Sequence, residues 1–170
     1  ISVWRIAKMF DFLRKFFKSS DQIIYIRFTR DKVSFSYYPS DVHYEDEPIL
    51  AIRKKGNKEL VSAVGREVYD LQPEDTSVIY TPFKPFEIEP DKFNFAEKLI
   101  RYLMQKGGDS TGAIVAPRVI IHPDKTYVSE MEEDAYRELA MGAGAREVVV
   151  YVGNELQSDE IESVMENRSA

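Results

Sequence analysis

Three stretches decide the fold that this sequence predicts: EPILAIRKKGN at 47–57, VSAVGREVYDL at 61–71 and GAGAREVVV at 142–150. The first two predict a strand over EPILAIRKK and another over ELVSAVG, joined by a turn at Gly56-Asn57, a dipeptide that suits a tight hairpin. The third predicts the glycine-rich end of a helix that leads into a buried strand.

Further strands are predicted on either side of the first two stretches. Residues 22–28 and 32–38 are rich in β-branched and aromatic residues and predict a hairpin. A short helix is predicted over 67–71, ending before Pro73. Residues 78–89 are interrupted by prolines, which predicts strands joined by an irregular turn.

The second half of the chain predicts alternating helices and strands. Helical periodicity runs from Asp91 to Gly107-Gly108, and Ser129 opens another helix that continues to Met141. Buried strands are predicted over 112–123 and 147–152. Early strands followed by alternating helix and strand predict an α/β domain.

Composition limits the chemistry open to this chain. Its 170 residues, 44% of them apolar, can bury one ordinary core. Cysteine is absent, which excludes a disulfide scaffold, a thiolate nucleophile and a cysteine metal site, and fits a reducing cytosol. The two histidines, His43 and His122, are far apart in sequence and give little support to a metal centre.

Charge is unevenly distributed. Residues 1–18 carry five Lys and Arg residues against one Asp, a net charge of +4, so the remainder carries −10 within the total of −6. An acidic body argues against nonspecific nucleic-acid binding, which requires clustered cations. A basic N-terminal segment before an acidic remainder indicates instead a domain that is tethered by that segment.

The first 20 residues predict an amphipathic helix that lies on a membrane. On a helix, its large apolar residues fall on one side and its cations on the other, and the segment is too short and too charged to span a bilayer. The alternative is a helix packed on the chain's own core. The residues predicted to bind membrane are Met9, Phe10, Phe12, Leu13, Arg14, Lys15, Phe16, Phe17 and Lys18.

Several motifs resemble, in their order and in their residues, the first lobe of the bacterial actins of the MreB, or rod shape-determining, family. They are EPILAI, SAVGREV, KPFEIEPD, PRVII and GAGAREVVV. The resemblance implies an actin-like, ribonuclease-H-like lobe over 21–153 with a mixed sheet, truncated after that lobe. It also implies that the amphipathic membrane helix occupies residues 1–20, with Met9 as a candidate start. Residues 154–170 are then a polar C-terminal tail, predicted as a frayed helix.

The residues that handle nucleotide in that family are replaced here. Where the family has an early DLGT segment, this chain reads Tyr25-Ile26-Arg27-Phe28, with neither the acid nor the glycine. A glutamate that orients water in the family is replaced within Val152-Gly153-Asn154, and a second phosphate loop lies in the other lobe. The sequence therefore predicts no cofactor, no ATP hydrolysis and no catalytic or metal-binding residue.

Two further motifs have ordinary structural explanations. His122-Pro123-Asp124-Lys125 matches the tetrapeptide of chaperone J-domains, but PRVII before it predicts a strand, where those domains have a helix. The acids Glu130, Glu132, Glu133 and Asp134 resemble a carboxylate cluster, but they fit better as the solvated first turn of a helix.

The leading hypothesis is a non-catalytic MreB-like protein at the inner face of the cell membrane. It would act by contact with MreB filaments or other cell-shape proteins and bind an anionic membrane surface, with no nucleic-acid partner. One alternative is half of a split actin-like ATPase completed by another chain. The other is a degenerate remnant without activity.

Overall fold

The computed structural model describes residues 21–75, 78–80, 83–84, 87–88, 90–108 and 115–168. Its strands are β1 (Ile23–Phe28), β2 (Val33–Tyr38), β3 (Val42–Asp46), β4 (Leu50–Lys55), β5 (Lys58–Val64), β6 (Val78–Tyr80), β7 (Phe83–Lys84), β8 (Glu87–Ile88), β9 (Arg118–His122) and β10 (Glu147–Val150). The helices are α2 (Phe93–Gly107), α3 (Glu130–Ala143) and α4 (Ser158–Arg168), with 3-10 turns η1 (Gly65–Asp70), η2 (Pro73–Asp75) and η3 (Pro90–Lys92). The nine residues predicted to bind membrane lie outside the described residues.

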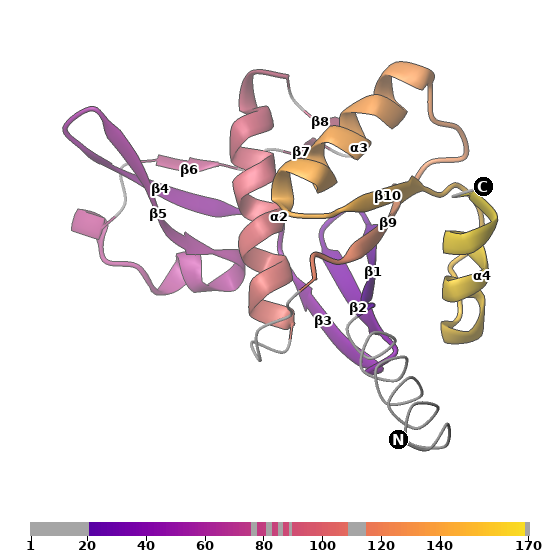
Figure 1. Cartoon of the computed structure of the whole chain (residues 1–170). Helices are drawn as coiled ribbons and strands as arrows, with labels where there is room; N and C mark the ends of the chain where they lie inside the picture. The colour runs from indigo at the N-terminus through magenta and orange to yellow at the C-terminus, as the bar shows by residue number, and fades with distance from the viewer. Residues whose placement is uncertain are drawn as a thin grey trace, which may run out of the picture.

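The main sheet has five strands in the order β10-β9-β1-β2-β3 (Figure 1). β1, β2 and β3 form an antiparallel meander, while β9 and β10 continue the sheet parallel to β1. The predicted hairpin, both helices and both late strands are confirmed, although β9 begins only at Arg118 and β10 ends at Val150. The sequence did not predict β3, because VHYED lies at the sheet edge, where three of its five residues are exposed.

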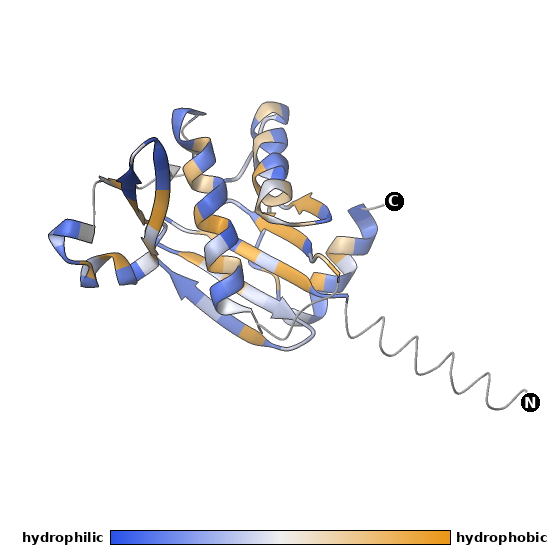
Figure 2. Ribbon diagram, turned by 60° about the vertical axis from the view of Figure 1, so that its left-hand side comes forward, coloured by the Kyte–Doolittle hydropathy of each residue, from blue (hydrophilic) through white to orange (hydrophobic). Residues whose placement is uncertain are grey.

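Helices cover both faces of this sheet (Figure 2). Ile24 and Ile26 of β1 face α2 and α3, while Ile23 and Tyr25 face α4. Burial on both faces explains why β1 is apolar nearly throughout instead of alternating.

The C-terminal tail is part of the packed body, which corrects the prediction of a frayed end. Helix α4 buries Ile161 and Met165, one turn apart, against Ile120 and Val149 of the sheet. The sequence did not reveal this packing because α4 turns only a narrow apolar stripe toward the sheet, and the rest of the helix is polar.

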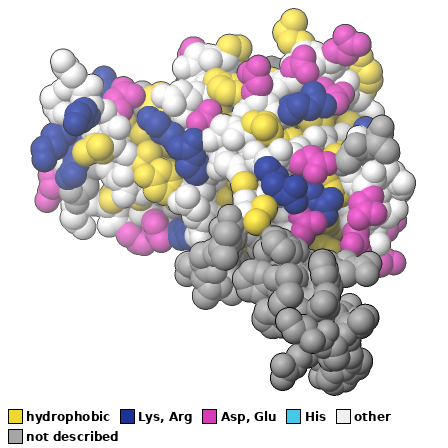
Figure 3. All heavy atoms as spheres, viewed as in Figure 1, with side chains coloured by type: hydrophobic (Ala, Val, Ile, Leu, Met, Phe, Trp, Pro, Cys, Tyr) yellow, Lys and Arg dark blue, Asp and Glu magenta, His cyan; other side chains and the backbone are white. Residues whose placement is uncertain are grey.

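A second sheet, in the order β5-β4-β6, extends beyond the helices on the left of Figure 1. β4 and β5 form the predicted hairpin around Gly56-Asn57. Lys and Arg side chains gather at this end of the molecule in the space-filling view (Figure 3).

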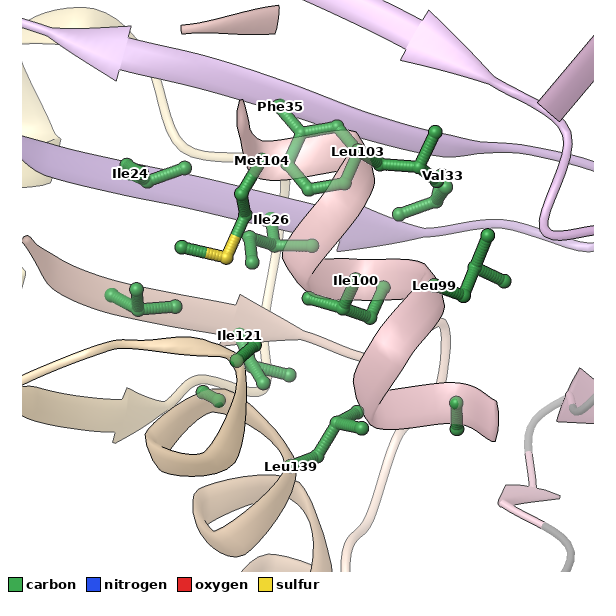
Figure 4. Close-up of a cluster of buried hydrophobic side chains, with 14 of the residues drawn as sticks. Ile24, Ile26, Val33, Phe35, Leu99, Ile100, Leu103, Met104, Ile121 and Leu139 are labelled. Atoms are coloured by element: carbon green, nitrogen blue, oxygen red, sulfur yellow. The ribbon is translucent and has the colours of Figure 1, made fainter. Parts of the chain in front are cut away.

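The largest core lies between the main sheet, α2 and α3. Figure 4 shows Leu99, Ile100 and Leu103 of α2 meeting the strands, with Leu139 of α3 beside them. Leu50 and Ile52 of β4 join the same core, so the second sheet is anchored to the first by apolar packing.

Helix α3 begins with the cap that the sequence predicts. The Ser129 hydroxyl accepts a hydrogen bond from the amide of Glu132, and the Glu132 carboxylate accepts one from the amide of Ser129. This reciprocal capping box satisfies two amides that the helix leaves unpaired. Gly144, in a left-handed conformation at φ 117°, ends the helix.

Asp46 joins the two sheets. Its Oδ1 accepts hydrogen bonds from the amides of Glu47 (2.9 Å) and Arg66 (2.8 Å), and its Oδ2 accepts one from the Tyr44 hydroxyl (2.5 Å). Burial raises the pKa of Asp46, but these hydrogen bonds outweigh burial and lower the pKa below its ordinary value. The carboxylate thus stays charged while it is only 5% exposed.

Gly65 allows the close approach at this joint. A Cβ on Gly65 would lie 2.1 Å from Asp46 Oδ2, and the residue has φ 63°, which favours glycine. Lys106 of α2 adds a cation 3.7 Å from the same oxygen. The stretches EPILAI and SAVGREV, which carry much of the family resemblance, therefore meet in space at a structural joint.

A similar joint lies at the amino ends of β1, β9 and β10. The Arg118 guanidinium donates two hydrogen bonds to the Asp21 carboxylate, at 2.7 and 3.2 Å. Arg146 pairs with the same carboxylate and donates a hydrogen bond to the carbonyl of Ala116 at 3.0 Å. PRVII and GAGAREVVV, the other motifs of the resemblance, therefore meet here.

Candidate functional site

The candidate binding site lies at the carboxyl ends of the parallel strands β1, β9 and β10. In open α/β sheets, ligands bind beyond this edge of the strands. The strands are in register, with Arg27 beside His122 and Tyr25 beside Ile120. Tyr25 and His122 are buried here, whereas Arg27 is partly exposed.

Tyr25 and His122 form a buried hydrogen-bonded pair. The Tyr25 hydroxyl lies 2.6 Å from His122 Nδ1, and His122 Nε2 lies 3.1 Å from the carbonyl oxygen of Gly153. A carbonyl only accepts hydrogen bonds, so Nε2 carries the proton, and Nδ1 accepts from the tyrosine. His122 is therefore the neutral Nε2 tautomer, held on both sides.

The surrounding segment closes over this pair. The Tyr25 hydroxyl also accepts a hydrogen bond from the amide of Leu156 at 3.3 Å. The His122 ring stacks on Tyr25 at 5.9 Å between centroids and meets the edge of Tyr151 at 5.1 Å. Residues 151–156 are thus fastened across the strand ends by one tyrosine and one histidine.

Burial sets the ionisation of both rings. Desolvation lowers the pKa of His122 below its ordinary value, although the hydrogen bond to Gly153 acts in the opposite direction. Desolvation likewise raises the pKa of Tyr25. At neutral pH both rings are therefore uncharged, so neither ring offers a cation to a phosphate.

Arg27 also points toward the closing segment. Its guanidinium lies 2.9 Å from the Glu155 carboxylate, with the two side chains 31% and 56% exposed. In the family resemblance, Arg27 stands where a glycine would let backbone amides approach a phosphate. Here the position carries a long cation that is paired with the chain's own acid.

Magnesium nucleotide is the ligand that the fold family implies, and these residues do not fit it. The strand end offers a tyrosine hydroxyl in place of a carboxylate, and the following turn, Thr29 to Lys32, contains no glycine. Among the described residues, no group of three or more His, Asp or Glu side chains could hold a metal ion. The Gly153 carbonyl is already bonded to His122 and the Leu156 amide to Tyr25, so neither group faces a phosphate.

The structural explanations predicted for the HPDK motif at 122–125 and for the acids at 130–134 are confirmed. His122 ends strand β9, so HPDK lies after a strand and not between helices. Glu132 caps α3 and pairs with Lys125, whose hydrogen bond is the largest cause that lowers the pKa of Glu132 to about 2. Glu133 and Asp134 pair with Arg137 on the same helix.

A Ser-His-Asp series on the edge hairpin was not predicted. Ser36 Oγ lies 2.8 Å from His43 Nδ1, and His43 Nε2 lies 3.6 Å from Asp41 Oδ1. The histidine and aspartate side chains are 66% and 79% exposed, so water surrounds them, whereas nucleophilic catalysis relies on a shielded site with oriented donors. We interpret the series as a surface contact of β2 and β3.

Comparison with known proteins supports the fold. No protein-family model matches the chain, and no curated protein sequence was found as a relative. Among solved structures, MreB5 of Spiroplasma citri bound to ADP matches with a TM-score of 0.59 and 19% identity, covering 78% of this chain and 38% of MreB5. The same protein bound to AMPPNP matches with a TM-score of 0.60.

A second bacterial protein gives the same result. The MamK double helical filament matches with a TM-score of 0.60 and 11% identity, covering 78% of this chain and 41% of MamK. The chain thus has the actin-like fold of MreB and MamK, as the sequence motifs predicted, and spans about two fifths of the length of either. At these identities the likeness establishes the fold alone.

Within the described residues, no helix combines the length and the apolar character needed to cross a bilayer.

Proposed function

We propose that this chain is a cytoskeletal actin-fold module that works by protein contact and without nucleotide. One observation carries the proposal: the carboxyl edge of the parallel strands is closed by the chain's own groups. Tyr25 and His122 hold residues 153–156 there, and Arg27 is paired with Glu155. A nucleotide would have to displace this buried network, whose polar groups would then need new partners.

The partner proposed is a filament of an MreB-type actin at the inner face of the cell membrane. One structure with the same fold is a double helical filament, which supports a lobe surface suited to filament contact. The amphipathic segment predicted over 1–20 would bring the module to an anionic membrane, where it would be a peripheral protein.

Nucleotide binding is tested first by thermal unfolding with and without magnesium ATP, with an intact MreB as positive control. A ligand present at a hundred times its dissociation constant stabilises a protein by about 2.7 kcal/mol, which raises the melting temperature of a domain this size by roughly 5–10 °C. We expect no rise for this chain. A rise of that size would contradict nucleotide independence.

Filament contact is tested by co-sedimentation with polymerised MreB, in the presence of ATP, ADP or neither. The chain is expected in the pellet in proportion to MreB, with no turnover of ATP beyond that of MreB alone. If the mixture hydrolyses ATP faster than MreB does, the chain completes a split ATPase. If the chain stays in the supernatant, the filament proposal is wrong.

A further inference from the structure

The β4–β5 hairpin carries a basic face that neither the core nor the joint at Asp46 explains. The register places Lys55 directly opposite Lys58 and Arg53 directly opposite Leu60, so these four residues share one side of the hairpin. Lys54 and Glu59 form the intervening pair on the other side. We call Arg53, Lys55, Lys58 and Leu60 the basic face.

The arrangement on this face costs local stability. Two like charges directly opposite on neighbouring strands repel each other, whereas Lys54 opposite Glu59 is a favourable pair. Lys55 and Lys58 are both exposed, and Leu60 keeps 41% of its surface exposed beside them. A cation pair beside an exposed leucine is what a binding surface would present to an anionic partner.

Among the described residues, nothing packs against Gly56 at the tip of the hairpin. A Cβ built on Gly56 would meet nothing within 4 Å, and the hairpin extends past the helices (Figure 1). Lys and Arg side chains gather at this end of the molecule in Figure 3. The basic face can therefore meet a flat surface while the acidic body stays at a distance.

We propose that the basic face contacts the headgroups of an anionic bilayer, as a second membrane contact of the chain. The mixture of cations and an exposed leucine is typical of segments at a membrane interface. A specific protein interface needs about 20–30 residues on each side, far more than these four. A lipid surface is continuous and requires no such area, so the face is suited to reinforce a tether.

The inference rests on the membrane association proposed above, and it is independent of nucleotide and filament binding. Each lysine near an anionic surface strengthens binding about fivefold, and the effect falls within about a Debye length. A single reversed charge on the basic face should therefore weaken binding more than fivefold. The same change on the other side of the hairpin should weaken it less.

The experiment measures partition of the full chain onto vesicles of equal parts phosphatidylglycerol and phosphatidylcholine, with pure phosphatidylcholine as a reference. Lys55→Glu is compared with the matched variant Lys54→Glu, which changes charge equally one residue away. We expect about a tenfold loss for Lys55→Glu, less than about threefold for Lys54→Glu, and a loss for the charge-neutral Leu60→Asn.

Stability provides an internal control. Lys55→Glu replaces a repulsive cross-strand pair with an attractive one, so its melting temperature should stay level or rise while membrane binding falls. Weaker binding in a variant of unchanged or higher stability cannot be attributed to unfolding.

Each other outcome overturns the proposal. Equal losses in the two lysine variants would show that only net charge matters. If neither variant loses binding but Phe16→Glu with Phe17→Glu does, the first 20 residues bind the membrane alone. If Lys55→Glu still binds vesicles but no longer sediments with MreB filaments, the basic face binds protein. A parent chain that does not sediment with vesicles refutes membrane contact and leaves the filament and nucleotide tests unaffected.

Discussion

The two ends of the parallel strands β1, β9 and β10 differ in what their polar residues do. At the amino ends, Asp21 binds Arg118 and Arg146, which belong to two of the motifs that resemble bacterial actins. At the carboxyl ends, Tyr25 begins the segment 25–28, where that resemblance breaks down, and His122 is its buried hydrogen-bond partner. The same strands thus carry a charged joint at one end and a neutral buried network at the other.

This difference separates the fold from its chemistry. A charged joint such as Asp21 with Arg118 fixes how the strands sit together, and it works whatever lies at the far edge. A neutral network such as Tyr25 with His122 fixes a covering segment without any charge of its own. The groups that fix the strands at their amino ends are therefore separate from those that cover their carboxyl edge.

The largest effect is expected from Asp21→Ala. Removing the carboxylate leaves Arg118, whose side chain is 12% exposed, with its charge uncompensated. Losing the charge-assisted hydrogen bonds to both Arg118 and Arg146 should lower the free energy of unfolding by about 3 kcal/mol. Urea unfolding measures this loss, and Asp31→Ala, at an exposed turn, should change the free energy by less than about 0.5 kcal/mol. Equal effects would contradict a special joint at Asp21.

A smaller loss is expected at the other end from Tyr25→Phe. The variant keeps the ring but leaves His122 Nδ1 without its donor and the Leu156 amide without its acceptor. Two buried groups without partners should cost about 2 kcal/mol. The exposed Tyr127 provides a matched Tyr→Phe control, for which no loss is expected. Hydrogen exchange at the Leu156 amide should accelerate only in Tyr25→Phe.

Local signals predicted the helices, the hairpins and Ser129 at the start of α3, because each is specified by neighbouring residues. Strand β3 was missed because its polar sequence is set by an edge position and by Asp46, whose partners include Arg66, 20 residues away. The Tyr25 and His122 network was missed because the two residues are 97 positions apart. Its available signal was a polar residue in each of two buried strands.

A pH dependence should distinguish the two ends further. The pKa of folded His122 lies below the value of about 6.5 for an unfolded histidine, because burial outweighs the attraction of Asp124 and Glu155, and Arg27 adds repulsion. The unfolded chain therefore binds more protons below pH 6.5. Stability should be full above that pH and fall as the pH drops toward the folded pKa, by at most about 1.4 kcal/mol per pH unit.

The measurement is the free energy of unfolding between pH 7.5 and 5.5. His122→Gln should remove most of the slope, because glutamine does not titrate in this pH range. If the slope persists in His122→Gln, other groups cause the pH dependence of the free energy of unfolding. The conclusion that His122 is buried in its neutral form would then be wrong.

The smallest loss of free energy of unfolding is expected from Arg27→Gln. This residue tests whether the two ends of the strands differ by charge alone, because Arg27 is charged but lies at the carboxyl edge. Its pair with Glu155 is partly exposed, so screening and side-chain entropy should limit the loss to about 0.5 kcal/mol, against about 3 kcal/mol at Asp21. The variant should also gain no affinity for magnesium ATP, since Tyr25 still occupies the strand end without a carboxylate. A loss comparable to that of Asp21→Ala, measured by urea unfolding, would mean that the covering segment is held by charge and not by the neutral network.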